Sequence, residues 1–351
     1  MADERVQAAI QHWAGRFIAN GIEYMDFVRT TSSISRWEEW LDAWTATAEV
    51  HMGLADEARE RGRRQTAGEA YMRAAVSYHF SKFVWVLDPE LNRRNTRAAV
   101  SAMYAAHEFL DPTAERIVAP LDDGVVVANL RRPPGDGPVP LVILIPGLDS
   151  TKEEFFGLES DYLRRGMATL SLDGPGQGET AFTMPIRPDY EVAVAAALGA
   201  LEGRPGLDLE RIGTTGVSLG GYYAARSAAF EPRIKAVAGV SGVYAVAAWW
   251  RVMPSLSREA FMHYSGSQSE AEGLARAETM NLEGVAERIE QPCLVVTGKL
   301  DRVVPWEETK RISDEAPHGE WHLYEDGTHV CNNIPFKYRP LVADWMRDRL
   351  G

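Results

Sequence analysis

The hydrophobic period of the chain changes near Pro112, and this change limits the folds open to it. From the start to about Leu110, apolar residues recur at helical spacing and strand patterns are scarce. After Pro112, short β-rich runs alternate with helical segments. A chain of 351 residues, of which 45% are hydrophobic, is long enough to bury two cores. We therefore predict a helical N-terminal domain over residues 1–112 and a second domain over residues 113–351.

Aromatic side chains form helical stripes in the N-terminal region. The stripes contain Trp37, Trp40, Trp44, Tyr78 and Phe83. Asp88-Pro89 and Asp111-Pro112 are expected to end helices, because proline cannot continue a helix and restricts the residue before it. This region is predicted to be all-helical, and packing in its core explains most of its aromatic content.

The second domain has the pattern of a doubly wound α/β sheet. A hairpin is expected over residues 115–133, with its turn at Asp122-Asp123-Gly124. The later apolar runs are nearly continuous, as in parallel strands that are covered on both faces, and helical segments separate them. These predicted strands cover residues 140–146, 167–173, 211–216, 234–242, 292–298 and 320–326.

A long helical interval, at about residues 243–291, separates two of these strands. It exceeds what one crossover helix requires, so we predict a lid inserted between the strands. Trp249 and Trp250 lie in it. These two rings can simply pack the lid onto the core, or they can form an apolar, stacking wall for a substrate.

Ser218 lies in the sequence Gly216-Val217-Ser218-Leu219-Gly220, which fits the G-x-S-x-G pattern of a nucleophilic serine on a sharp strand-to-helix turn. A serine needs a base, and the base needs a third group that holds its tautomer. Asp301 follows the 292–298 strand and His329 follows the last strand, in the expected order Ser, acid, His. All three are predicted at the carboxyl edge of the sheet, where catalytic groups gather.

Each of these residues also has a simpler interpretation. Ser218 can be an ordinary turn residue, and Asp301 can be only a helix cap before "PWEETK". Asp326 is the rival acid, although it lies so close to His329 in sequence that it would have to reach back along its own loop. His322, inside a predicted strand, is expected to be structural.

An oxyanion hole requires N–H groups directed at developing negative charge. We expect one from Leu219, directly after the nucleophile, and the other from Leu148, in the loop after the 140–146 strand. Pro146 offers no polar side chain there. The stretch "DGPGQGE", residues 173–179, is expected to be a turn beside the active site and not a phosphate loop, because Pro175 interrupts the spacing and no helix begins directly after it.

Charge and composition argue against several classes of partner. Lysine and arginine number 37 against 50 acidic residues, so the net charge is −13 and no basic stripe is available for nucleic acid. No apolar run approaches the roughly 20 residues that span a bilayer, and the acidic start is unlike a signal peptide. Cys293 and Cys331 are expected to be reduced thiols, and no metal-ligand spacing is present. We expect a soluble, cytoplasmic protein without metal or cofactor.

Several linked motifs resemble one family of α/β-hydrolases. They are "PGLDSTKEEFF", "RGMATLSLDGPGQGE", "GVSLGGYYAARSAAFEPRIKA", "KLDRVVP" and "DGTHVCNN", behind the helical "AGEAYMRAAVSYHF". The family is related to 2,6-dihydroxypseudooxynicotine hydrolase of nicotine breakdown and takes in FrsA-like esterases and fungal pigment enzymes that shorten polyketide chains. The resemblance implies an α/β-hydrolase fold with a helical N-terminal cap domain and a helical lid, a triad of Ser218, Asp301 and His329, and a homodimer.

The resemblance also implies a substrate class. Some members cut a carbon-carbon bond next to a ketone, and others cleave esters. Some carbon-carbon hydrolases place an acid soon after the strand that here ends "SGVY", but residues 242–258 contain none. The expected pocket for a small-molecule substrate contains Trp249, Trp250, Tyr78, His79 and Asp149.

Three functional hypotheses follow. The first is a serine hydrolase that cleaves a carbon-carbon bond next to a ketone, or an ester, in a bulky aromatic or polyketide-like substrate through an acyl-serine intermediate. The second is an acyl transferase or cyclase that uses the same triad, with an internal nucleophile in place of water. The third is a non-catalytic ligand-binding protein that keeps the hydrolase fold.

Overall fold

The computed structural model describes residues 3–351, which fall into two compact units. Unit 1 contains the described residues up to Ala114 and the segment Glu153–Gly157. Unit 2 contains Glu115–Lys152 and Leu158–Gly351. We describe each unit by itself.

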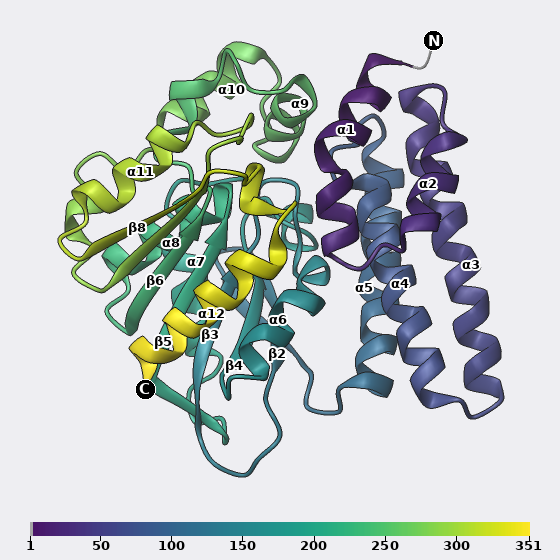
Figure 1. Cartoon of the computed structure of the whole chain (residues 1–351), viewed down its shortest axis with the longest axis horizontal. Coiled ribbons are helices and arrows are strands. Elements are labelled where there is room, and N and C mark those ends of the chain that lie inside the picture. Colours follow the sequence, from purple (N-terminus) through teal and green to yellow (C-terminus); the bar gives the residue numbers. More distant parts are fainter. Residues whose placement is uncertain (1–2) are drawn as a thin grey trace. The chain divides into compact units, whose positions relative to one another are not determined.

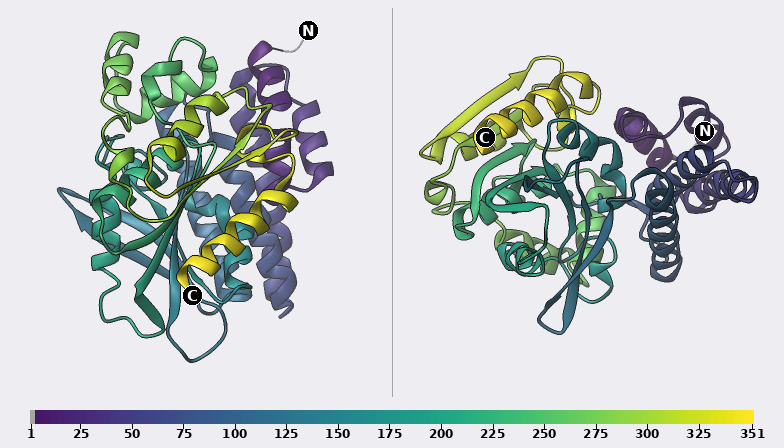
Figure 2. Two further views of the ribbon diagram at one scale, coloured as in Figure 1. Left: turned by 60° about the vertical axis from the view of Figure 1, so that its left-hand side comes forward. Right: turned by 90° about the horizontal axis from the view of Figure 1, so that it is seen from below.

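Unit 1 is helical. Its long helices α3, α4 and α5 lie side by side, α3 against α4 and α4 against α5 (Figures 1 and 2). The tryptophans and Phe83 of the predicted stripes are buried and pack against one another, and Phe17 stacks on Phe80 with 3.9 Å between ring centres. These rings therefore form the core of unit 1. Its elements are α1 (Glu4–Ala19), α2 (Tyr24–Ser32), η1 (Trp37–Glu39), α3 (Trp40–Glu60), α4 (Arg64–Lys82) and α5 (Pro89–Leu110).

Asp88-Pro89 begins a helix instead of ending one, which corrects the prediction from sequence. α4 already ends at Lys82, and Pro89 is the first residue of α5. The Asp88 carboxylate accepts hydrogen bonds from the N–H groups of Glu90 and Leu91. Proline is favoured at this first position because the N–H group that it lacks would have no partner within the helix.

A buried charged cluster surrounds Glu154 in unit 1. Its carboxylate accepts two hydrogen bonds of 2.7 Å from the Arg16 guanidinium and one of 2.7 Å from the Asn20 amide, and it bonds to His79 Nε2 at 2.9 Å. Burial alone would raise the pKa of Glu154, but the Arg16 and His79 partners hold that pKa far below its ordinary value. The segment Glu153–Gly157, which follows the loop after β3, is therefore anchored within unit 1 by an ionised carboxylate.

We predict that Glu154→Gln destabilises the protein by about 3–5 kcal/mol, because it removes the charge of one partner from a buried, doubly hydrogen-bonded ion pair with Arg16. The matched control is Glu57→Gln, which removes a surface pair with Arg61 in which both side chains are more than half exposed, and a surface pair is worth less than about 1 kcal/mol. Urea denaturation of both variants measures the difference. Equal losses of stability would contradict this account of the cluster.

Unit 2 is built on one sheet, with the strand order β1-β2-β4-β3-β5-β6-β7-β8. β1 pairs with β2, and β2 with β4, in antiparallel fashion, and all the other neighbours are parallel (Figure 1). The strands are β1 (Glu115–Leu121), β2 (Gly124–Arg131), β3 (Val139–Ile145), β4 (Ala168–Asp173), β5 (Leu207–Val217), β6 (Ile234–Val240), β7 (Cys293–Gly298) and β8 (Gly319–Tyr324).

The mostly parallel sheet predicted from sequence is confirmed, with most strand ends within a residue or two of their predicted places. The main difference is β5, which begins at Leu207 and not at residue 211. The register against β3 jumps at this end: Pro140 pairs with Asp208 and Leu141 pairs with Ile212, so residues 209–211 form an irregularity within the strand. The charged residues before Ile212 also interrupt the apolar run by which the rest of the strand is recognised in sequence.

Helices cover both faces of the sheet. α6 and α12 lie on one face, and α7 and α8 lie on the other (Figure 1). α8 packs on β5, which ends directly before Ser218, and on β6, whose Val240 carbonyl accepts the Ser218 N–H. The helices that flank the sheet are α6 (Phe156–Leu163), α7 (Glu191–Gly199), α8 (Leu219–Phe230), α11 (Trp306–Glu315) and α12 (Pro335–Leu350).

The predicted helical insertion lies between β6 and β7. It contains α9 (Ser255–Tyr264) and α10 (Glu270–Glu278), with short turns η4 (Val246–Trp249) and η5 (Ala286–Arg288) on either side. Its two ends are joined by a bridge between Ala245 and Asn281. Among residues 3–351, no helix has the length and apolar character that a membrane span requires.

Candidate active site

Ser218 occupies the turn between β5, which ends at Val217, and α8, which begins at Leu219. Its backbone has φ 55° and ψ −124°, a conformation that is strained for a residue with a side chain. Glycines make this turn possible. A Cβ added at Gly216 would lie 1.9 Å from the carbonyl oxygen of Gly220, and one at Gly220 would lie 2.2 Å from the carbonyl oxygen of Ile145. The G-x-S-x-G glycines are thus required for backbone contact around the serine.

Ser218, His329 and Asp301 form one hydrogen-bonded chain. His329 Nε2 lies 3.0 Å from Ser218 Oγ, and His329 Nδ1 lies 2.8 Å from Asp301 Oδ2. Asp301 follows β7 and His329 follows β8, so both come from strand ends. The chain has the connectivity of a nucleophile, a base and an orienting acid.

The Asp301 carboxylate is buried, with 2% of its side chain exposed. Its Oδ1 accepts hydrogen bonds from the N–H groups of Val303 at 2.8 Å and Val304 at 3.0 Å. Burial would raise the pKa of Asp301, but the His329 ring and these two N–H groups hold that pKa below its ordinary value. At neutral pH the carboxylate is therefore charged, and it can stabilise a positive charge on His329.

The alternatives that the sequence left open are separated by this geometry. Pro305, and not Asp301, directly precedes α11. The Asp326 side chain is 56% exposed and pairs with Lys337 Nζ at 2.5 Å, away from His329. His322 lies within β8 and packs against Tyr324. Only Asp301 among these carboxylates bonds to His329.

Sequence reasoning did not identify Ser241. Its hydroxyl, which is buried, accepts a hydrogen bond of 2.9 Å from the N–H group of Val330, the residue after His329. Ser241 and Val330 both have positive φ angles, 48° and 55°. Ser241 thus ties the strained loop of the histidine to the end of β6. The only signal for this role in the sequence was the position of Ser241, directly after an apolar strand.

Of the two predicted oxyanion donors, Leu219 directly follows Ser218, and Leu148 follows Gly147, whose backbone lies close to Ser218. Leu219 is the first residue of α8, and the first N–H groups of a helix have no partner within it. A Cβ added at Gly147 would lie 3.2 Å from Ser218 Cβ, so the backbone that leads into Leu148 passes directly beside the serine. Oxyanion stabilisation by these two N–H groups is a prediction that this arrangement supports.

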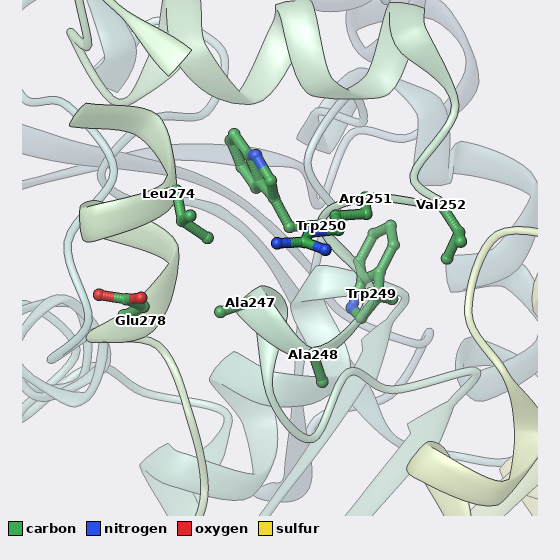
Figure 3. Close-up of a pocket in the computed structure, with 8 residues that line it drawn as sticks. All are labelled: Ala247, Ala248, Trp249, Trp250, Arg251, Val252, Leu274 and Glu278. Carbon is green, nitrogen blue, oxygen red and sulfur yellow. The ribbon is translucent and has the colours of Figure 1, made fainter. Parts of the chain in front are cut away.

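Trp249 and Trp250 line a cavity of about 290 Å³ at the base of the lid (Figure 3). Both side chains are largely buried, and Trp250 packs edge to face on Phe261 with 5.6 Å between ring centres. Packing of the lid therefore accounts for most of their surface. Within residues 3–351, both indole N–H groups lack a hydrogen-bond partner. No triad residue lines this cavity, and a stacking wall for a substrate stays a prediction.

The other predicted pocket residues have different surroundings. Tyr78 and His79 belong to α4 in unit 1, and Asp149 lies half-buried in the loop after β3. His79 is fully buried and bonds to Glu154, so its surroundings give no support to a contact with substrate. Tyr78 is half-buried, and its hydroxyl pKa is raised by burial. Substrate contact by these residues stays a prediction.

No cluster of three or more histidine, cysteine, aspartate or glutamate side chains that could hold a metal ion is found among residues 3–351. Cys293 and Cys331 are free thiols, and both are buried. Burial raises the pKa of each thiol to about 12, so neither is a reactive thiolate at neutral pH.

Comparison with known proteins identifies the family. The family described as esterase FrsA-like matches residues 26–350. The chain belongs to this family. The FrsA-like relatives include 2,6-dihydropseudooxynicotine hydrolase of Paenarthrobacter nicotinovorans, which is 32% identical over 96% of this chain and 91% of its own length. The crystal structure of the 2,6-dihydroxy-pseudo-oxynicotine hydrolase matches with a TM-score of 0.88 over 96% of this chain and 95% of that chain.

A fungal relative covers less of the chain. The 20-hydroxy-prefusarin hydrolase of Gibberella moniliformis is 36% identical over 58% of this chain, and the match spans 52% of the fungal enzyme. These relatives are named hydrolases. This FrsA-like chain is thus an enzyme with the α/β-hydrolase fold, and the hypothesis of a non-catalytic binding protein is set aside.

We predict that Asp301→Asn lowers kcat by about 10⁴-fold, because the amide leaves His329 in the wrong tautomer. Asp326→Asn, the matched control, should change kcat little, since this carboxylate pairs with Lys337 at the surface. Steady-state kinetics on an activated ester provides the comparison. A larger loss in the Asp326 variant would mean that the acid is misassigned.

Proposed function

We propose that the protein is a serine hydrolase that cleaves an acyl group from a bulky, partly aromatic ketone or ester through an acyl-serine intermediate. The observation that carries this proposal is the hydrogen-bonded chain from Asp301 through His329 to Ser218. The names of the relatives, hydrolases of a pseudooxynicotine and of a prefusarin, support small organic substrates.

Acylation begins when Ser218 Oγ attacks the carbonyl carbon and its proton passes to His329 Nε2. The resulting imidazolium is stabilised by Asp301, whose lowered pKa keeps it charged. The carbonyl oxygen becomes an oxyanion, for which Leu219 and Leu148 are the proposed N–H donors. When the tetrahedral species collapses, the leaving group takes the proton from His329 and the acyl group stays on Ser218.

Deacylation repeats these steps with water. His329 removes a proton from the water molecule as it attacks the acyl carbon, and the proton then returns to Ser218 Oγ as the acid leaves. The same groups therefore serve both half-reactions.

One mechanism serves both types of substrate. In an ester the leaving group is an alkoxide. In a β-diketone it is a carbanion that is stabilised as an enolate, so its charge lies largely on oxygen. Protonation by His329 is available to both, and the proposal therefore does not need an acid within residues 242–258, where there is none. Acyl transfer or cyclisation differs only in the nucleophile of the second step, and incorporation of oxygen from labelled water distinguishes it from hydrolysis. A homodimer and a cytoplasmic location stay predictions.

We predict that Ser218→Ala lowers kcat by about 10⁶-fold and leaves the fold intact, because it removes only the nucleophile. Ser227→Ala is the matched control, since Ser227 is a buried serine of α8, the helix that follows Ser218. Activity and circular dichroism of both variants provide the test. Residual activity of Ser218→Ala within about tenfold of wild type would exclude Ser218 as the nucleophile, because triad serines contribute far more.

A matched pair of substrates tests whether both types of substrate pass through the same acyl-serine intermediate. An activated ester and a β-diketone with the same acyl group give the same acyl-serine, so we expect the same deacylation rate from both in rapid-quench experiments. Two different rates would show that the substrates do not share an acyl-enzyme, and the proposed mechanism would be wrong.

A further inference from the structure

The 173–179 turn, "DGPGQGE", holds the loop that follows β3. Gln177 is 2% exposed, and its Nε2 donates hydrogen bonds to the carbonyl oxygens of Pro146 at 2.5 Å and Gly147 at 3.2 Å. The turn therefore binds carbonyl groups and not phosphate. Gly147, one of the two residues that Gln177 binds, is also the residue whose backbone passes beside Ser218.

The Gln177 carboxamide has one orientation that satisfies all its neighbours. Its Oε1 accepts from the N–H group of Gly174 at 3.0 Å and from the hydroxyl of Tyr190 at 2.7 Å. Burial raises the pKa of Tyr190 well above its ordinary value, so the phenol keeps its proton. This proton has two acceptors in reach, Gln177 Oε1 at 2.7 Å and the carbonyl oxygen of Leu172 at 3.3 Å. Two donors thus meet the amide oxygen and two carbonyl oxygens meet the amide nitrogen. A flipped amide would direct its N–H groups at the N–H group of Gly174 and its oxygen at the two carbonyl oxygens, so these three contacts fix the orientation.

The bond to Gly147 fixes the direction of the next N–H group. The peptide between Gly147 and Leu148 is planar and trans, so its C=O and its N–H point in opposite directions. With the carbonyl of Gly147 directed at Gln177, the N–H group of Leu148 must point away from Gln177. Oxyanion donors act only when they are held in place before charge develops, and this bond supplies such a constraint.

The far end of the same loop is held by the same turn. The backbone N–H and the Nζ of Lys152 both donate to the Asp173 carboxylate, at 2.8 and 2.9 Å, and Nζ also bonds to Glu179 at 2.9 Å. Gly178 makes this possible, because a Cβ there would lie 1.9 Å from Asp173 Oδ2. Residues 146 to 152 are thus fixed at both ends.

We propose that Gln177 is a positioning residue of the oxyanion hole, which acts by orienting the peptide that carries the N–H group of Leu148. The proposal rests on the proposed function of Ser218 as nucleophile. It gives the 173–179 turn a role in catalysis, although none of its side chains needs to touch the substrate.

The test compares two variants in this turn. Gln177→Met keeps the approximate length of the side chain and removes the carboxamide, both its N–H donors and its acceptor oxygen. Thr180→Val, the control, removes a buried hydrogen bond of 2.8 Å to the carbonyl of Asp173 and leaves the bonds to Pro146 and Gly147 in place. Each variant is measured for thermal stability, for kcat and KM on one activated ester, and for the inhibition constant of a trifluoromethyl ketone, which forms an oxyanion on the serine.

We expect Gln177→Met to lower kcat by up to about 10²-fold, near the lower end of the loss when an oxyanion donor is removed. KM should stay close to wild type, and the inhibition constant should rise by the same factor as kcat falls. Thr180→Val should lose stability but keep the kcat, the KM and the inhibition constant of the wild-type protein. If Gln177→Met does not fold, the same comparison is made with Gln177→Leu, a smaller side chain that also has no donor.

Two failures are distinguishable. If a fluorophosphonate does not label Ser218 in the wild-type protein, the proposed function is wrong and the positioning role falls with it. If Ser218 is labelled but the Gln177 variant has the same kcat and the same inhibition constant as Thr180→Val, only the positioning role is wrong.

Discussion

The strained backbone of Ser218 is the constraint on which the site depends. Its conformation, φ 55° and ψ −124°, costs on the order of 1–3 kcal/mol and persists only if the surroundings enforce it. Close backbone packing that glycine alone permits does so, between β5 and α8 at Gly216 and between α8 and the end of β3 at Gly220. The N–H group of Ser218 also donates to Val240 at 2.9 Å, which fixes the turn to β6. The strain therefore places the hydroxyl at the end of the sheet, where His329 can reach it.

Buried polar contacts hold the other loops against this turn. Asp301 is fixed by two backbone N–H groups, the loop of His329 by Ser241, and the loop after β3 by Gln177 and Asp173. The contacts of Ser241, Gln177 and Asp173 are buried, so the loss of any of them would leave an unsatisfied polar group. The two bonds of Asp301 are partly buried and are made within its own loop. A set of flexible connections is thereby held in one arrangement, as a preorganised site requires.

The sequence was enough to predict the sheet, the helical insertion and the three residues that bond in a chain, because apolar runs mark buried strands and catalytic residues follow strand ends. It was not enough for Gln177 or Glu154. Their partners, Gly147 and Arg16, are distant in sequence, and no local pattern predicts a contact that only the folded chain creates. It also failed at Asp88-Pro89, since a proline that starts a helix and one that follows a helix have similar local sequences.

The most direct test of this account is a crystal structure of the protein after reaction with a fluorophosphonate. The account predicts phosphorus bonded to Ser218 Oγ, with one phosphonyl oxygen about 2.7–3.1 Å from the backbone nitrogens of Leu219 and Leu148, and the carbonyl of Gly147 still directed at Gln177. An adduct on another residue, or a phosphonyl oxygen that points away from both nitrogens, would contradict it.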